Sequence, residues 1–244
     1  MTADEVRSYY GRPILKPPEW TWEVPWYLFV GGLAGVSSAL SGVAGLAGRR
    51  TLQDRTRLLG SAGAVVGPAL LISDLGRPQR FLNMLRVFKP TSAMSVGSWI
   101  LAAYSAAAGG AGLLAMAGRF PRLRVLADCV AAALGLPLAT YTAVLVADTS
   151  VPAWHEAREQ LPFVFLGSAV ASAGAAAALL TPADEAGVGD VLAVGGVAAE
   201  LAAAETMHRH LGALGSVYRE GRAGHYQRLA TGLSAAGALA VVAG

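Results

Sequence analysis

Residues 74–99 read DLGRPQRFLNMLRVFKPTSAMSVGSW; they lie between two long apolar runs and are too polar to cross a bilayer. Within this stretch, apolar side chains recur at helical spacing: Phe81, Met84, Leu85 and Phe88. Polar side chains occupy the opposite side: Arg80, Asn83 and Arg86. Pro78 suits a first helical turn, and Pro90 cannot continue a helix. The sequence therefore predicts an amphipathic helix over residues 78–89 that lies in the membrane surface.

The composition of the whole chain places it in a lipid bilayer. Of 244 residues, 54% are hydrophobic and 14% are charged, whereas soluble domains carry roughly 25% charged residues. Apolar runs of about 20 residues, enough to cross a bilayer, occur at about 25–47, 57–74, 94–117, 125–147, 161–181, 188–207 and 226–244. We expect an all-α polytopic membrane protein, a helical bundle of about seven transmembrane helices. It would form one domain over residues 25–244, after an N-terminal interfacial arm over residues 1–24.

The cysteine, histidine and basic residues argue against several classes of protein. The single cysteine, Cys129, lies in an apolar run, so no set of thiolates is available for an iron–sulphur cluster or zinc. The histidines lie in predicted loops or at span ends, which disfavours haem binding between helices: His155, His208, His210 and His225. The arginines lie between apolar runs rather than along one face, so nucleic-acid binding has little support. The connections on the N-terminal side carry more Lys and Arg, which predicts a cytoplasmic N-terminus.

Acidic residues in or beside the spans need a physical reason, because a carboxylate inside a membrane helix costs at least about 2.5 kcal/mol. Asp74 ends the second span and Arg77 follows it, so the two could form a salt bridge or move a proton. Asp148, at the end of the fourth span, is either a proton-path residue or a solvated acid. Glu200 lies near the middle of the sixth span. It either carries protons or pairs with an arginine or serine of a neighbouring helix.

Tyr141 lies deep in the fourth span, so its hydroxyl needs a partner or a cavity. It could be a core tyrosine bonded to a backbone carbonyl. It could instead donate a hydrogen bond to a bound ligand while remaining neutral at pH 7. Glu23 and Tyr27 are spaced to share one face of the first span.

Three stretches together resemble the NrfD-like family, the membrane subunits of polysulphide-reductase-type and formate-dehydrogenase-type respiratory complexes. They are residues 74–99, quoted above, residues 20–35, WTWEVPWYLFVGGLAG, and residues 139–154, ATYTAVLVADTSVPAW. Such proteins exchange electrons between a quinone and an iron–sulphur partner, usually without a haem of their own. Members usually have an eighth span, which we take to be absent here.

The resemblance implies a quinone-binding site formed by Glu23, Tyr27, Asp74, Arg77 and Tyr141. It also implies that the quinone is menaquinone. The proton-path candidates beside this site are the acidic residues in or next to the spans: Asp74, Asp148 and Glu200. An iron–sulphur subunit would dock at the basic residues of the surface helix: Arg80, Arg86 and Lys89. That subunit would accompany a molybdopterin catalytic subunit at the plasma membrane. The chain itself would bind no haem, iron–sulphur cluster or other metal, and would not be active alone.

The chain departs from the family pattern at one position. Some relatives place a histidine where this chain has Tyr27, and an asparagine that matches Val24 or Glu23. A tyrosine can still donate to a carbonyl, but it is a poorer proton acceptor. Two other interpretations remain open: a proton- or ion-coupled transporter with Glu200 and Asp74 as coupling sites, and a pure membrane anchor for a soluble enzyme.

Overall fold

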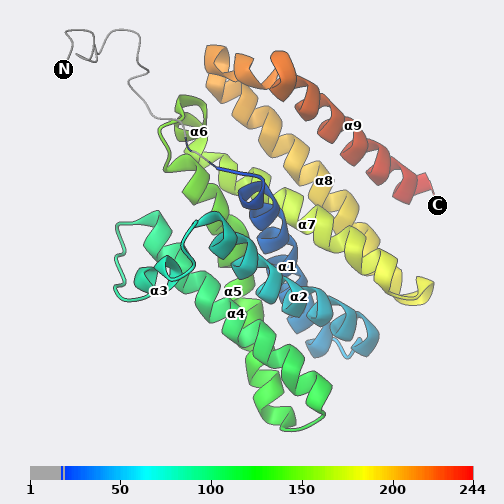
Figure 1. Ribbon diagram of the computed structural model, residues 1–244. Helices are drawn as coiled ribbons and strands as arrows, with labels where there is room; N and C mark the ends of the chain where they lie inside the picture. The colour runs from blue at the N-terminus through cyan, green and yellow to red at the C-terminus, as the bar shows by residue number, and fades with distance from the viewer. Residues whose placement is uncertain (1–17, 19, 244) are drawn as a thin grey trace, which may run out of the picture.

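The structure is a computed structural model that describes residue 18 and residues 20–243, and the regular structure in this part of the chain is entirely helical (Figure 1). The α-helices are α1 (Glu23–Leu46), α2 (Arg50–Asp74), α3 (Arg80–Met84), α4 (Ala93–Ala117), α5 (Pro121–Ala147), α6 (Pro152–Glu156), α7 (Leu161–Leu180), α8 (Ala183–Leu211) and α9 (Gly221–Ala243). Short 3-10 helices follow α6 and α8: η2 (Ala157–Glu159) and η3 (Gly212–Tyr218). The predicted all-α architecture is confirmed. Most of the predicted N-terminal arm lies outside the described residues.

Six of the helices are long and apolar enough to cross a membrane: α1, α2, α4, α5, α7 and α8. They coincide with the first six predicted spans. The predicted seventh span is also a helix, α9, but it is not among these six. Its first two turns contain Arg222, His225 and Arg228. These charged and polar side chains lower the mean hydropathy of α9, whose other residues are mostly apolar.

The predicted helix ends differ from the observed ones at the membrane surface. α2 begins at Arg50 rather than near residue 57, and α8 extends over Ala183–Leu211 rather than 188–207. Most of the added residues are polar, and several of them, such as arginine, glutamine and glutamate, are good helix formers, so the helices can continue past the hydrocarbon core into the headgroup region. An apolar run marks only the part of a helix inside the hydrocarbon. Arg57 therefore lies about two turns inside α2 instead of at its end.

Helix α1 lies at the centre of the fold, in contact with α2, α5 and α7 (Figure 1). Helices α1, α2, α4 and α5 form a four-helix bundle in which α4 packs on α2 and α5, while α7 and α8 form a hairpin that packs on α1 and α5 through α7. Helix α9 packs on the outside of α8. Each long helix traverses the bundle. The turns α1–α2, α4–α5 and α7–α8 thus share one end, the turn end, and α3, α6 and η3 share the other, the α3 end.

Glycines allow two pairs of helices to approach at backbone distance, as small residues do in membrane bundles. A Cβ built on Gly35 of α1 would lie 2.2 Å from the carbonyl oxygen of Gly135 in α5. In the α7–α8 hairpin, a Cβ on Gly174 would lie 2.4 Å from the backbone nitrogen of Ala193. The small-residue surface predicted for the first span thus packs at Gly35. A Cβ on Gly31 would meet nothing within 4 Å.

The surface helix predicted over residues 78–89 is shorter than expected, because α3 spans only Arg80–Met84. The predicted length is therefore wrong. The chain leaves the helix after Leu85, where the side chain of Ser95 in α4 binds the backbone instead. Ser95 Oγ donates to the Val87 carbonyl at 3.1 Å and accepts from the Lys89 N–H at 3.0 Å. Pro90 also disfavours a helical conformation at Lys89. Of the predicted apolar face, Phe81 still packs against the core.

Replacing Ser95 by alanine should loosen the segment between α3 and α4. The variant loses both hydrogen bonds to this loop, worth about 1 kcal/mol each. We expect limited trypsin digestion in detergent to cleave faster after Arg86, which is exposed on this segment. Ser73→Ala is the control, because Ser73 bonds only the Leu70 carbonyl of its own helix among the described residues. Equal cleavage rates in the two variants would refute this role of Ser95.

Candidate functional site

Two tyrosines from different helices lie close together in the interior of the bundle. Tyr27 of α1 is 1% exposed, and Tyr141 of α5 is also buried. Tyr27 packs in a cluster with Leu101 of α4, and the ring of Tyr141 lies over Gly97, one turn earlier on α4, so both rings meet the same stretch of that helix. Neither hydroxyl has a hydrogen-bond partner in the described part of the chain, although buried polar groups normally have one. The pair therefore presents two free hydrogen-bond donors.

The position of Tyr141 is fixed by a glycine of α4. The aromatic ring lies directly over Gly97, so that a Cβ on this residue would be 1.5 Å from Tyr141 Cζ and 1.9 Å from its hydroxyl oxygen. Any larger residue at Gly97 would displace the ring. On the other side, the ring of Tyr27 faces Gly67 of α2 and packs in a cluster with Leu101. Helices α1, α2, α4 and α5 thus position the two hydroxyls together.

Two carboxyl groups meet at a threonine at the α3 end of the bundle. Thr21 Oγ1 donates to Asp74 Oδ1 at 2.8 Å, and it also contacts Glu23 Oε2 at hydrogen-bonding range. A hydroxyl carries one hydrogen. Thr21 can therefore donate to only one of the two carboxyls at a time. Glu23 lies one turn before Tyr27 on the same face of α1, so the carboxyls and the tyrosines share this end.

Arg77 does not join this group. It is exposed and forms no ion pair with Asp74. The chain turns at Gly76, whose φ is +63°, so the helical spacing that would bring residues 74 and 77 together ends at Asp74. The salt bridge that the sequence permitted is thus absent. The predicted docking residues Arg80, Arg86 and Lys89 are also exposed, on the segment that carries α3.

The other predicted proton-path residues lie apart from the tyrosine pair. Asp148 is exposed at the C-terminal end of α5, which fits a solvated helix-end acid. Glu200 of α8 is half-buried and lines a cavity together with Ser168 of α7, one of the kinds of partner that the sequence left open. Its side chain lines two cavities, of about 250 and 330 Å³. The larger of these is bordered by the stacked rings of Trp20 and Trp154, whose centroids are 5.7 Å apart.

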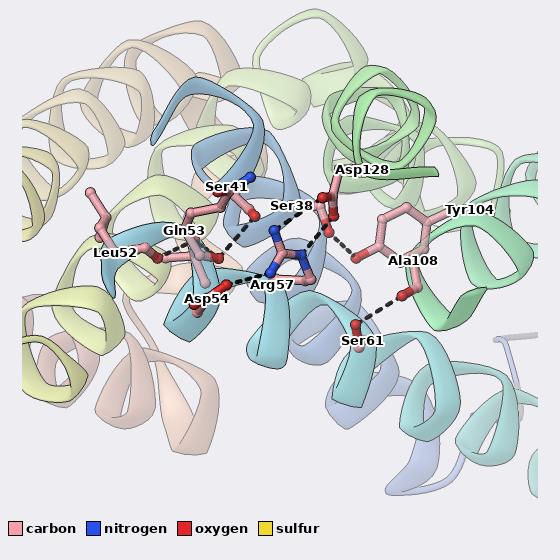
Figure 2. A network of polar contacts seen from close by, with 11 residues as sticks. Ser38, Ser41, Leu52, Gln53, Asp54, Arg57, Ser61, Tyr104, Ala108 and Asp128 are labelled. Carbon is pink, nitrogen blue, oxygen red and sulfur yellow. Dashed lines mark hydrogen bonds and ion pairs between the residues drawn. The ribbon is translucent and has the colours of Figure 1, made fainter. Parts of the chain in front are cut away.

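The sequence analysis missed a buried ion pair between α2 and α5 (Figure 2). Arg57 is 6% exposed and Asp128 is 7% exposed. Arg57 Nε donates to Asp128 Oδ1 at 2.8 Å, and Nη2 donates to Oδ2 at 3.0 Å, a two-point contact that fits guanidinium and carboxylate geometry. Asp54 accepts a further bond from Arg57 Nη1 at 2.5 Å. The pair joins α2 to α5 inside the bundle.

A second, separate set of hydrogen bonds lies beside this ion pair (Figure 2). Tyr104 of α4 is fully buried, and its hydroxyl lies 2.8 Å from both the Ala34 carbonyl and Ser38 Oγ of α1. It also lies 3.2 Å from the Gly60 carbonyl of α2. A cavity of about 10 Å³ lies between Tyr104's partner Ser38 and Arg57, close to the smallest volume that holds one water. These contacts tie together all four helices that hold the tyrosines.

Comparison with known proteins identifies the family of this chain. A family model described as "Polysulphide reductase, NrfD" matches residues 16–187, about two thirds of the chain. The match covers α1 to α7, and so includes both tyrosines and the carboxyls at Thr21, while Glu200 lies outside it. No curated protein and no solved structure matches the chain. Within the described residues, no three His, Cys, Asp or Glu side chains are grouped so that they could hold a metal ion.

Proposed function

The chain belongs to the NrfD family of polysulphide-reductase membrane subunits, and we propose that it is the quinone-binding subunit of a respiratory oxidoreductase complex. Subunits of this family work in membrane complexes with iron–sulphur and catalytic partners. The observation that carries the proposal is the pair of free hydroxyls, Tyr27 and Tyr141, at one end of the bundle.

The two hydroxyls fit the acceptors of a quinone. A quinone, when bound, supplies redox chemistry of two electrons and two protons, and its carbonyl oxygens accept hydrogen bonds. Tyrosine donates such bonds while remaining neutral at pH 7. The packing of Tyr141 over Gly97 fixes the direction of its hydroxyl without a competing partner in the described chain. Tyr27 and Tyr141 would therefore orient the headgroup.

The carboxyls at Thr21 would handle protons. Asp74 is half-buried at the end of α2, and Glu23 is similarly half-buried at the start of α1. A carboxyl in this position can take a proton from water at the α3 end and hold it beside Thr21. Arg77, exposed beside this group, would stay at the entrance rather than in the site. Asp148 and Glu200 lie outside this arrangement, and the proposal does not depend on them.

The basic surface at the α3 end would receive the iron–sulphur subunit. Arg80, Arg86 and Lys89 are exposed there, on the same side as the tyrosine pair. Electrons would then pass between this subunit and menaquinone at the α3 end, and a molybdopterin catalytic subunit would bind beyond the iron–sulphur subunit. We place the α3 end in the cytoplasm. Arg57 is paired inside the bundle and does not count as a loop charge, which widens the excess of basic residues at that end.

Replacing Tyr141 by phenylalanine should weaken quinone binding about five- to tenfold. The change removes one hydrogen-bond donor, worth about 1 kcal/mol or somewhat more, and keeps the ring over Gly97. The measurement is a fluorescence titration of the detergent-purified protein with a hydroxyquinoline N-oxide, a quinone analogue. Tyr27→Phe should have a similar effect, because both hydroxyls are free in the same site.

Tyr226→Phe is the matched control, since Tyr226 on α9 is 61% exposed, whereas both tyrosines of the site are buried. Its affinity should equal that of the unaltered protein. If the unaltered protein shows no saturable binding, the anchor or transporter interpretation replaces the proposal. If Tyr226→Phe weakens binding as much as Tyr141→Phe does, the analogue binds elsewhere and the tyrosine site is wrong.

A further inference from the structure

We propose that a groove at the turn end binds an anionic phospholipid. The groove has a volume of about 820 Å³ and lies between the last turns of α1, the start of α2 and the first half of α5. Its mouth is polar, with Arg50, Gln53 and Arg124, and its length is apolar, with Leu46 and Leu136. The phosphodiester would bind the arginines, and an acyl chain would lie along α1 and α5.

The arginines at the mouth lack partners within the described residues. Arg124 forms no side-chain hydrogen bond or ion pair there, and its Nε is buried. Leaving a buried donor unpaired is costly, and more so when the group is charged. Arg50 on α2 is likewise unpaired among these residues. A phosphodiester offers charged oxygens that match guanidinium donors. The two arginines therefore favour an anionic ligand.

Two carboxylates also line the groove, Asp54 and Asp128, but both are bonded to Arg57. Asp128 is held by two hydrogen bonds and Asp54 by one. Both oxygens of Asp128 are thus directed to Arg57, behind the groove, and neither carboxylate pairs with Arg50 or Arg124. The mouth keeps a positive charge that an anionic headgroup would neutralise.

The length of the groove matches a lipid rather than a soluble anion. On α5 its lining residues recur every four positions, on one face of the helix: Arg124, Asp128, Ala132 and Leu136. This face is about 18 Å long at 1.5 Å per residue, and one leaflet of the hydrocarbon core is about 15 Å thick. Along α1, Val43 and Leu46 are 62% and 90% exposed. A free phosphate would leave this apolar length uncovered.

The test is native mass spectrometry of the purified protein with added phosphatidylglycerol or phosphatidylcholine. We expect preferential retention of phosphatidylglycerol, and Arg124→Gln should weaken it at least about fivefold. Arg122→Gln is the control, because it removes the same charge from the same turn but does not line the groove. It should leave retention unchanged. Arg50→Gln is a second variant at the mouth, used in place of Arg124→Gln if that protein does not fold.

Three results would overturn the proposal. Equal retention of the two lipids would show that the headgroup charge is not recognised. An equal loss in Arg122→Gln and in the groove variants would reduce the effect to general surface charge. Retention of glycerol phosphate as strong as that of the lipid would show that the arginines bind a soluble anion and that the apolar length is unused.

Discussion

Replacing Asp128 by asparagine should lower the free energy of unfolding by about 3 kcal/mol. The change keeps the shape of the side chain but leaves Arg57, 6% exposed, without its buried counter-charge. Breaking a buried pair on one side typically costs about 3–5 kcal/mol. We expect the lower end of this range, because Asp54 still bonds Arg57 from the surface. The measurement is equilibrium unfolding in mixed detergent micelles, followed by helical circular dichroism.

A double replacement separates the loss of attraction from the cost of an unpaired charge. Arg57→Met with Asp128→Leu removes both charges and fills the site with apolar groups of similar volume. Such replacements are often neutral or stabilising, so this protein should be clearly more stable than Asp128→Asn. If the double variant is less stable than Asp128→Asn, the unpaired arginine is not the main cause of the loss of stability, and the attraction within the pair is.

An exposed ion pair gives the matched control. Arg209 and Glu205 lie one turn apart on α8, with their oxygen and nitrogen 2.7 Å apart, and both side chains are exposed. Surface pairs of this kind contribute little, since water and salt screen them. Glu205→Gln should leave the stability unchanged within error. A loss as large as that of Asp128→Asn would mean that burial does not explain the effect.

The helices of this fold could be predicted from the sequence, but their ends could not. A run of apolar residues marks the length of helix inside the hydrocarbon, so the first six predicted spans coincide with observed helices. α2 begins at Arg50 because polar residues also form helix in the headgroup region. The surface helix failed for a different reason: Ser95, on the next helix, competes for the backbone after Leu85.

The buried ion pair shows what a single sequence conceals. Arg57 and Asp128 are 71 residues apart, and each lies near the end of an apolar run, where a solvated charge is also reasonable. One indication was present: two opposite charges lie near the ends of two apolar runs on the same predicted side of the membrane. Their pairing depends on how far α2 extends beyond its apolar run and on which helices are neighbours.

Much of the proposed site could be predicted, since helical spacing placed Glu23 and Tyr27 on one face. The structure brings Tyr27 to Tyr141 and Glu23 to Asp74. Arg77 was expected to lie beside Asp74 because the two are three residues apart, but the turn at Gly76 separates them. The observed partner of Asp74 is Thr21. Thr21 precedes α1, so neither helical periodicity nor the apolar pattern could indicate this contact.

The geometry of the tyrosine pair depends on how closely α1 approaches α5, and Gly35→Ala tests this dependence. The new Cβ would lie 2.2 Å from the Gly135 carbonyl oxygen, whereas carbon and oxygen normally approach no closer than about 3.3 Å. The two helices must therefore separate by roughly 1 Å. Overpacking of this kind costs about 1–3 kcal/mol, and we expect the upper end because the opposing atom is backbone and cannot change rotamer.

The same separation would move Tyr27 away from Tyr141, so Gly35→Ala should also weaken binding of the quinone analogue at temperatures where the protein remains folded.

Gly109→Ala in α4 is the control, because a Cβ there meets nothing within 4 Å. Alanine forms helix more readily than glycine, by up to about 1 kcal/mol, so this variant should be at least as stable as the unaltered protein. Equal stability of the two alanine variants would mean that α1 and α5 do not approach at Gly35. If Gly35→Ala is destabilised but its affinity is unaltered, the close contact of α1 and α5 is real but the site does not depend on it. The two hydroxyls would then reach the ligand independently of each other.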